Sequence, residues 1–324
     1  MGKYSNQLPQ LGGDLFLTDG GIETTLIFHE GLDLPYFAAF HLMKTPEGRE
    51  ALKKYYNAYI AIAKADRVGF ILESPTWRAS SDWGTKLGYS AAEIAAVNRD
   101  SIALMQELRD AHESASTPMV VSGCVGPRGD GYDPGQIMTV AEAEDYHSLQ
   151  VAAFAAAGVD MITAVTMTNT HEAVGIVRAA QKVSVPVAIS FTVETDGRLP
   201  TGESLESAIN AVDFSTAHGA AYFMINCAHP THFDAVLPRN ASWTKRLRGI
   251  RANASMRSHQ ELNDSPDIDM GDPVTLGAQY RELLRRLPQL TVLGGCCGTD
   301  HRHIQSISHA CRSGELGARR AKAG

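Results

Sequence analysis

Short apolar runs alternate with longer amphipathic stretches along the whole chain. The runs hold few polar residues, which is typical of parallel strands that are buried on both faces. We expect eight strands, over residues 15–18, 68–73, 119–123, 161–165, 187–192, 222–226, 247–252 and 291–293.

Helix signals lie between these runs. Thr45-Pro46 places a proline at the start of a helix expected over 47–65. Ser90-Ala-Ala-Glu93 and Thr139-Val-Ala-Glu142 are capping boxes, for helices that end near residue 114 and at Gly158. Further helices are expected over 170–182, 205–218, 274–287 and 301–311.

Eight strands that are each followed by a helical pattern predict an α/β protein, a (β/α)8 TIM barrel. We expect one domain, residues 1–324, with a core over about 12–314 and a disordered tail over 315–324. A doubly wound open sheet is the main alternative, but no Gly-x-Gly-x-x-Gly follows the first strand. The weaker stretch 230–243 is expected to hold one short helix, and 253–273 to form a long surface loop.

Composition and charge limit the partners and the cellular location that we expect for this protein. The chain has 324 residues, 44% of them hydrophobic, and a formal net charge of −7 without a basic block, so nucleic acid is not expected as a partner. Residues 1–10 lack the apolar core of a secretory signal, and no run reaches the roughly 18 apolar residues of a membrane span. We therefore expect a cytoplasmic protein with no membrane partner, whose thiols are free or metal-bound.

Three of the five cysteines lie together at the ends of two predicted strands. Cys227 comes after 222–226, and Cys296 and Cys297 come after 291–293, with glycines on both sides of the pair. Glycine lets the backbone bend, so both sulfurs can point to one place. The carboxyl ends of barrel strands carry function, and three thiolates with one open position are the layout of catalytic zinc. Cys124 and Cys311 are expected to be small core residues.

Other strand ends are polar as well. Asp19-Gly20-Gly21 follows the first strand, Glu73 ends the second, and Asn226 precedes Cys227. A lone acid after a strand is often a cap or a turn residue, so Asp19 is either a turn residue or part of a site. Three histidines near the cysteines are expected at the surface and not as ligands, namely His229, His301 and His303.

Five motifs, in order along the chain, resemble the homocysteine S-methyltransferase family, which includes betaine-dependent and S-methylmethionine-dependent enzymes. They are Asp19-Gly-Gly-x-x-x-x-Leu26, Gly123-x-Val-Gly-Pro127, Ser190-Phe-Thr192, Asn226-Cys227 and Gly294-Gly-Cys-Cys-Gly-Thr299. The resemblance implies a (β/α)8 barrel and Zn²⁺ bound by Cys227, Cys296 and Cys297. It also implies a substrate thiol near Asp19, and we take Gly20, Glu23 and Asn226 as further substrate-binding residues.

The chain departs from the family at two places. Many members carry a Glu at the end of strand four that helps to hold the substrate, whereas this chain has Val165. Asn253-Ala-Ser255 stands where many relatives have a Pro-Asn-x-Gly pattern. Glu23 is either a replacement for the missing acid, or a solvated loop residue or an acid in the first turn of a helix.

The expected reaction moves a methyl group from an onium-type donor to the thiol of homocysteine, giving methionine. A free alkyl thiol titrates at roughly 8.5, and coordination to zinc removes its proton. Trp77 and Tyr89 are candidates to contact the onium group by a cation–π interaction, or are ordinary packing residues. The alternatives are a different thiol acceptor, or a non-catalytic zinc-thiolate protein, which the lack of a fourth ligand disfavours. The sequence selects neither a donor nor an oligomeric state.

Overall fold

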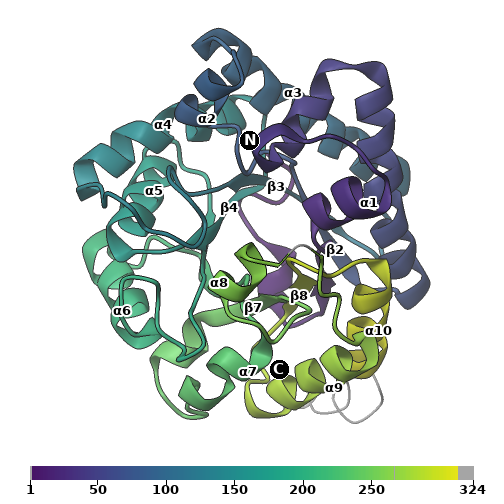
Figure 1. Cartoon of the computed structure of the whole chain (residues 1–324), viewed down its shortest axis with the longest axis vertical. Helices are drawn as coiled ribbons and strands as arrows, with labels where there is room; N and C mark the ends of the chain where they lie inside the picture. The colour runs from purple at the N-terminus through teal and green to yellow at the C-terminus, as the bar shows by residue number, and fades with distance from the viewer. Residues whose placement is uncertain (1, 266, 313–324) are drawn as a thin grey trace.

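Eight parallel strands close into a barrel in chain order, with β1 pairing to both β2 and β8. The computed structural model describes residues 2–265 and 267–312, and within them Figure 1 shows the helices arranged around the strands. The predicted (β/α)8 barrel is confirmed and the open doubly wound sheet is excluded. The predicted tail, residues 315–324, lies outside the described residues.

The strands agree with the apolar runs to within a few residues at each end. They are β1 Phe16–Leu17, β2 Gly69–Glu73, β3 Met119–Val125, β4 Met161–Met167, β5 Val187–Phe191, β6 Tyr222–Asn226, β7 Leu247–Ala252 and β8 Val292–Gly295.

Three helices begin at the predicted starts, directly after Thr45, Ser90 and Thr139. The side chains of Ser90 and Thr139 accept hydrogen bonds from the backbone N–H three residues on, as capping boxes require. The α-helices are α1 Pro46–Asp66, α2 Ser81–Lys86, α3 Ala91–His112, α4 Val140–Ala156, α5 Thr170–Lys182, α6 Leu205–Thr216, α7 Pro230–Phe233, α8 His259–Asn263, α9 Pro273–Arg286 and α10 His301–Arg312.

Two expectations for irregular segments need correction. The segment 253–273 is not simply a surface loop, because it contains α8 and because Asn253 and Ser255 are buried against the barrel mouth. The segment 230–243 holds the short helix α7, as expected, but a 3-10 turn, Asp234–Val236, follows it directly. The segment between β1 and α1 is also helical in part, with a π-helical turn over Thr24–His29.

The barrel interior has two layers. The lower layer, toward the amino-terminal ends of the strands, is apolar, and the upper layer, toward their carboxyl ends, is polar. Side chains alternate between faces along a strand, so every second residue points into the barrel. The lower positions form a buried apolar cluster that includes Phe16, Ile71, Val120, Met161 and Val292. Two residues further along β2 to β6, buried polar residues take their place, namely Glu73, Ser122, Thr163, Ser190 and Asn226, and β7 adds the buried Arg251.

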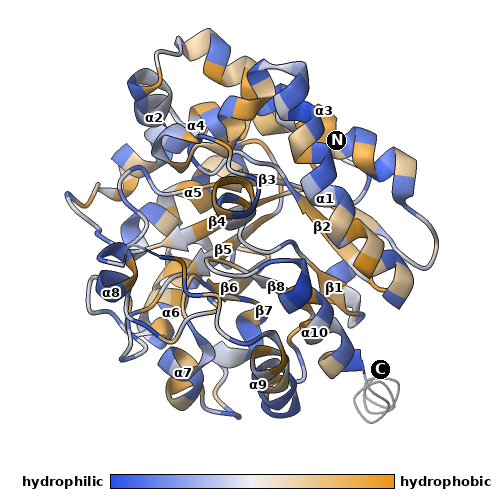
Figure 2. Ribbon diagram, turned by 45° about the vertical axis from the view of Figure 1, so that its right-hand side comes forward, coloured by the Kyte–Doolittle hydropathy of each residue, from blue (hydrophilic) through white to orange (hydrophobic). Residues whose placement is uncertain are grey.

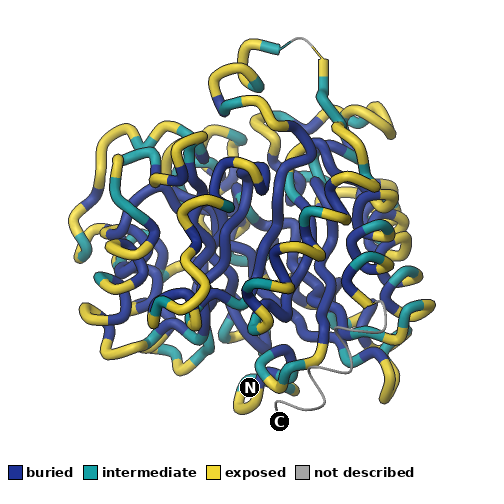
Figure 3. Tube along the Cα trace, turned by 90° about the horizontal axis from the view of Figure 1, so that it is seen from below, coloured by how far each residue is buried: buried dark blue, intermediate teal, exposed yellow. Residues whose placement is uncertain are grey.

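The main core lies between the strands and the surrounding helices. Apolar residues of α1, α3, α5, α9 and α10 pack there against the outward faces of the strands. Figure 2 shows the strands coloured mainly as hydrophobic and the helices with two-sided colouring, and Figure 3 shows buried strands inside exposed outer surfaces. No helix in the described ranges is long and apolar enough to cross a membrane.

Tyr280 of α9 links β7 and β8 by hydrogen bonds near the carboxyl ends of the strands. Its hydroxyl donates to the carbonyl of Gly294 in β8 at 2.6 Å and accepts from the N–H of Ala252 in β7 at 2.7 Å. Tyr280→Phe leaves both buried backbone groups without this partner, so we expect a loss of about 1–3 kcal/mol in unfolding free energy. Urea denaturation measures it, with the exposed Tyr36→Phe as the control. Equal losses in the two variants would contradict the role of the hydroxyl.

Candidate metal centre and substrate pocket

Three cysteine sulfurs meet at the carboxyl ends of β6 and β8. The Sγ of Cys227 lies 3.0 Å from that of Cys296 and 3.4 Å from that of Cys297. All three sulfurs lie within 4.8 Å of one another, and this is the one such cluster of potential ligands in the described part of the chain. The structure therefore brings together the three cysteines that the sequence singled out.

The local backbone explains why these sulfurs converge. Cys227 has a φ of 56°, in the left-handed region, which turns its side chain away from the direction of β6. A Cβ on Gly294 would lie 1.8 Å from Oγ1 of Thr18, and one on Gly295 would lie 2.1 Å from Oγ1 of Thr299. Gly294 and Gly295 are thus required because a side chain at either position would prevent the close approach of β8 to its neighbours. This requirement is separate from the backbone flexibility that glycine provides.

The thiols hydrogen-bond to one another, so they do not titrate alike. Hydrogen bonds from Cys227 and Cys296 hold the pKa of the Cys297 thiol well below its usual range. Hydrogen bonds with Cys296 and Cys297, together with burial, raise the pKa of the Cys227 thiol well above its usual range. Thiolates are the ligands that soft divalent cations prefer, so these three side chains are suited to hold such an ion.

Tyr132, from the loop after β3, lies over this cluster. Its hydroxyl is 3.2 Å from Sγ of Cys227 and 3.4 Å from Sγ of Cys297. Its ring stacks on His259 of α8, with 3.9 Å between the ring centroids. The Nε2 of His259 lies 2.7 Å from the carbonyl oxygen of Cys227, and its Nδ1 lies 3.1 Å from Glu194. The sequence carries no signal for Tyr132, which lies in a loop without a periodic pattern, and the short helix α8 that carries His259 was expected to be part of a loop.

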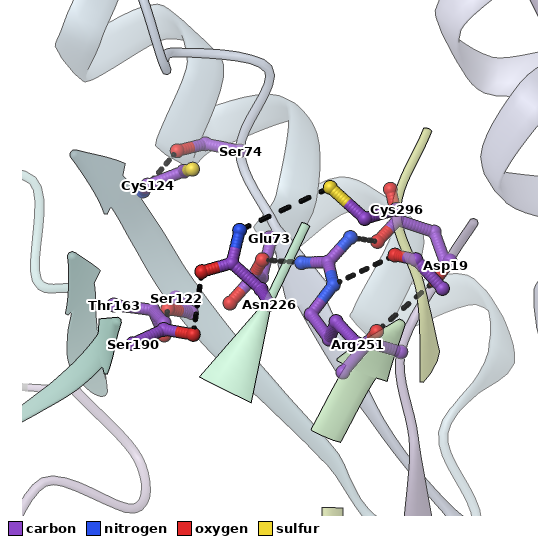
Figure 4. Close-up of polar contacts among 12 residues, drawn as sticks. Asp19, Glu73, Ser74, Ser122, Cys124, Thr163, Ser190, Asn226, Arg251 and Cys296 are labelled. Atoms are coloured by element: carbon purple, nitrogen blue, oxygen red, sulfur yellow. Dashed lines mark hydrogen bonds and ion pairs between the residues drawn. The ribbon is translucent and has the colours of Figure 1, made fainter. Parts of the chain in front are cut away.

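Arg251 of β7 forms the floor of the cavity, and Figure 4 shows it below Cys296. Its Nη2 lies 2.6 Å from Oδ1 of Asp19, its Nη1 contacts Oε2 of Glu73, and its Nε donates to the carbonyl of Gly295 at 3.1 Å. Burial raises the pKa of both Asp19 and Glu73, while the guanidinium opposes that shift. Sequence reasoning missed this role, although a charged residue inside a buried apolar run was a usable signal.

The predicted residues Asp19 and Gly20 lie in the pocket wall, and both accept hydrogen bonds from Arg251 of the floor. The other oxygen of Asp19 accepts a hydrogen bond from the hydroxyl of Tyr55 at 2.8 Å. The carbonyl of Gly20 accepts from the same hydroxyl at 3.1 Å. Arg251 and Tyr55 thus hold Asp19 in place, with one partner on each carboxylate oxygen.

Asn226, at the end of β6, links three strands and faces the metal centre. Its Oδ1 accepts from Oγ of Ser190 at 2.7 Å and from the N–H of Thr166 at 2.8 Å. Its Nδ2 donates to Oγ1 of Thr166 at 2.9 Å and faces Sγ of Cys296 at 3.9 Å. Thr166 has a φ of 62°, unusual for a β-branched residue, and these bonds hold it there.

Glu23 and Val165 line the same cavity as the cysteines, which has a volume of about 360 Å³. Val165 is buried at the position where the family acid was expected. Glu23 is half-buried directly before the π-helical turn Thr24–His29 and forms no ion pair with another described side chain. Burial, followed by the negative charges of Cys296 and Asp19, raises the pKa of Glu23 to about 7. The structure thus puts Glu23 in the cavity and not in solvent.

The remaining candidates divide between pocket and core. Trp77 lines the cavity, whereas Tyr89 does not: it is buried against Phe40, with its hydroxyl 3.0 Å from Nδ1 of His41. Cys124 and Cys311 are buried, as expected.

The expectation of three surface histidines was wrong for two of them. His301 is exposed, but His229 and His303 are buried. His303 is enclosed because its Nδ1 lies 3.1 Å from Oδ1 of Asp300 and its Nε2 lies 2.8 Å from the carbonyl oxygen of Met270. Neither buried histidine belongs to the sulfur cluster.

Removal of the Arg251 guanidinium should destabilise the protein to an extent that depends on pH. Arg251→Met leaves Asp19 and Glu73 buried without their cation, so we expect a loss of about 3–5 kcal/mol in unfolding free energy at pH 8. Burial raises the pKa of both acids, so the folded variant holds protons more tightly than the unfolded chain does. Its stability therefore falls as the pH rises, and the loss should be smaller at pH 5 than at pH 8. Urea denaturation at both values measures it.

Arg248→Met is the matched control, because Arg248 lies in the same strand and is half-buried outside the pocket. We expect its loss to stay below about 1 kcal/mol, the ordinary size of a surface effect. A pH-independent loss in Arg251→Met would contradict the electrostatic role of the guanidinium.

The comparisons with known proteins agree with this geometry. Homocysteine S-methyltransferase 1 of Arabidopsis thaliana is 26% identical over 321 residues, covering 91% of this chain and 93% of the relative. Selenocysteine Se-methyltransferase of Brassica oleracea var. italica is 23% identical, covering 91% and 88%. The metallated form of the homocysteine methyltransferase MmuM from Escherichia coli has the same fold, with a TM-score of 0.70 and 20% identity over 91% of this chain and 96% of that one. A family model described as Homocysteine S-methyltransferase matches residues 16–311, and the chain belongs to that family.

Proposed function

We propose that this protein transfers a methyl group from an onium-type donor to the thiol of homocysteine, giving methionine. The observation that carries the proposal is a cluster of three thiols at the edge of a cavity large enough for small substrates. Family membership supports the same chemistry. Methionine formation, followed by mass spectrometry with S-methylmethionine, betaine and related sulfonium donors in separate reactions, tests it.

The residues of the cluster fit a zinc ion. Thiolates are soft ligands that zinc prefers, and three protein ligands leave one position for a substrate. Cys227, Cys296 and Cys297 would hold the ion, and all three line the cavity. A zinc ion bound there would supply a position at which an acceptor thiol loses its proton.

The surrounding residues position the reactants and control their charges. The amide of Asn226 faces Cys296 and holds the end of β6 against β4 and β5. An acceptor sulfur then attacks the methyl carbon in line: a new S–C bond forms, and the bond from carbon to the onium atom breaks with its electron pair left on that atom. Both charges diminish in the transition state, so a pocket that excludes water favours the step.

The cysteines should be individually necessary for metal binding. Cys296→Ala removes one of three ligands, so we expect most of the zinc and nearly all activity to be lost while the barrel stays folded. Metal analysis of the purified protein, with circular dichroism, measures both. Cys124→Ala is the control, because Cys124 lines the cavity but lies outside the cluster. Full zinc content in the Cys296 variant would contradict the assignment.

Glu23 is proposed to bind the ammonium group of the acceptor, which a pocket without a carboxylate would leave unpaired. Glu23→Gln should weaken homocysteine binding by about 1.5–3 kcal/mol, the range for a hydrogen bond to a charged group, with zinc content unchanged. Because the pKa of Glu23 is about 7, its carboxylate forms as the pH rises through 7. The wild type should therefore bind homocysteine more tightly than Glu23→Gln by a larger margin at pH 8 than at pH 6. Titration calorimetry at pH 6 and pH 8 measures it.

Glu30→Gln is the matched control, because Glu30 follows the same π-helical turn but pairs with Lys54 outside the pocket. Equal homocysteine affinity in wild type and Glu23→Gln would contradict the ammonium role. That outcome would favour the second candidate function, methyl transfer to a different thiol acceptor. The observation behind this candidate is Val165, a cavity residue without charge where many family members carry the substrate-holding Glu.

A further inference from the structure

Arg78 is a charged cavity residue with no part in the chemistry proposed above. It lies in the loop between β2 and α2 and lines the same cavity as the cysteines, although only 5% of the residue is exposed. Its guanidinium carbon is 4.1 Å from the ring centroid of Trp77 and 3.7 Å from that of Trp83. The two indoles hold the guanidinium in one place, as cation–π contacts do.

The hydrogen bonds of this guanidinium are incomplete. Its Nη1 donates to the carbonyl of Gly129 at 2.8 Å. Its Nη2 is 3.7 Å from Oδ2 of Asp130, too far for a hydrogen bond, and its Nε has no partner among the described residues. A guanidinium has five N–H donors, and buried donors without acceptors are costly. Arg78 is therefore a fixed buried cation with free capacity for an anion.

A carboxylate is the anion that this arrangement suits. The planar fork of arginine matches the two oxygens of a carboxylate, and such charge-assisted pairs are stronger than neutral ones. Asp130 does not fill this role, because its side chain is half-exposed and stands at 3.7 Å. Burial lowers the pKa of Arg78 to about 10, so the group is still charged at neutral pH.

We propose that Arg78 binds the α-carboxylate of an amino-acid substrate in this cavity. The inference rests on the proposed function, since both homocysteine and the zwitterionic methyl donors carry a carboxylate. Glu23 lines the same cavity and is close enough for its charge and that of Arg78 to affect each other. The pocket thus presents one anion and one cation to a ligand with an ammonium group and a carboxylate.

The rival interpretation makes Arg78 a clamp for the loop that carries Tyr132. The bond from Nη1 to Gly129 fits that role. It leaves Nε and Nη2 unexplained, and it requires no particular ligand. The two interpretations differ in what they predict for ligands that lack the carboxylate.

The experiment compares ligand pairs by titration calorimetry on the zinc-loaded protein. One pair is homocysteine and 3-amino-1-propanethiol, and the other is S-methylmethionine and its decarboxylated sulfonium. We expect the wild type to prefer the carboxylated member of at least one pair by roughly 10- to 150-fold, as a hydrogen bond between charged groups provides. In Arg78→Gln that preference should fall to within about threefold. The pair that responds identifies the acceptor or the donor as the source of the carboxylate.

Two further variants complete the test. Arg128→Gln is the control: Arg128 stacks on Tyr146 and pairs with Asp82 outside the cavity, so its preferences should equal those of the wild type. Asp130→Asn removes the nearby competing carboxylate at an exposed position. Asp130→Asn should tighten the binding of the carboxylated ligand several-fold and leave the affinity for the decarboxylated ligand unchanged. If Arg78→Gln does not fold, this variant alone tests whether Arg78 binds the carboxylate.

Two results would overturn the inference. One is a wild type without carboxylate preference in either pair, and the other is a folded Arg78→Gln that keeps the preference. If Arg78→Gln does not fold, unchanged binding in Asp130→Asn overturns it instead. Failure of the wild type to bind homocysteine at all would count against the proposed function, and the donor pair would still test Arg78.

Discussion

One buried guanidinium holds the site end of the barrel together. Arg251 extends from β7 to Asp19 after β1, to Glu73 of β2 and to the carbonyl of Gly295 in β8. Its charge makes it possible to bury two carboxylates side by side, which would otherwise be costly. The guanidinium and the two acids together form a polar floor of the cavity that the three cysteines line.

The layered interior of the barrel explains why chemistry is confined to one end. The lower layer is apolar, and Leu8 from the N-terminal segment packs into it. The upper layer is polar and continues into the cavity through Glu73, Asn226 and Arg251. Since the side chains of a strand alternate strictly, the same register that fills the lower barrel also directs these polar groups toward the cysteines.

The sequence predicted the features that neighbouring residues encode. Apolar runs and capping boxes located the strands and most helices, and a glycine-flanked cysteine pair pointed to the metal centre. Features that depend on distant contacts were missed. The role of Arg251 depends on carboxylates from β1 and β2, and Tyr132 reaches the sulfurs only because its loop folds over the mouth. His303 was expected at the surface because it lies in a first helical turn, yet its burial depends on the segment around Met270.

The central claim is that the three-cysteine centre keeps one coordination position for the substrate thiol. X-ray absorption spectroscopy of the zinc-loaded protein measures it most directly, by counting sulfur neighbours with and without homocysteine. We expect three sulfurs at about 2.3 Å in the free protein and four when homocysteine is present. An unchanged sulfur count on addition of homocysteine, or four protein sulfurs in its absence, would contradict it.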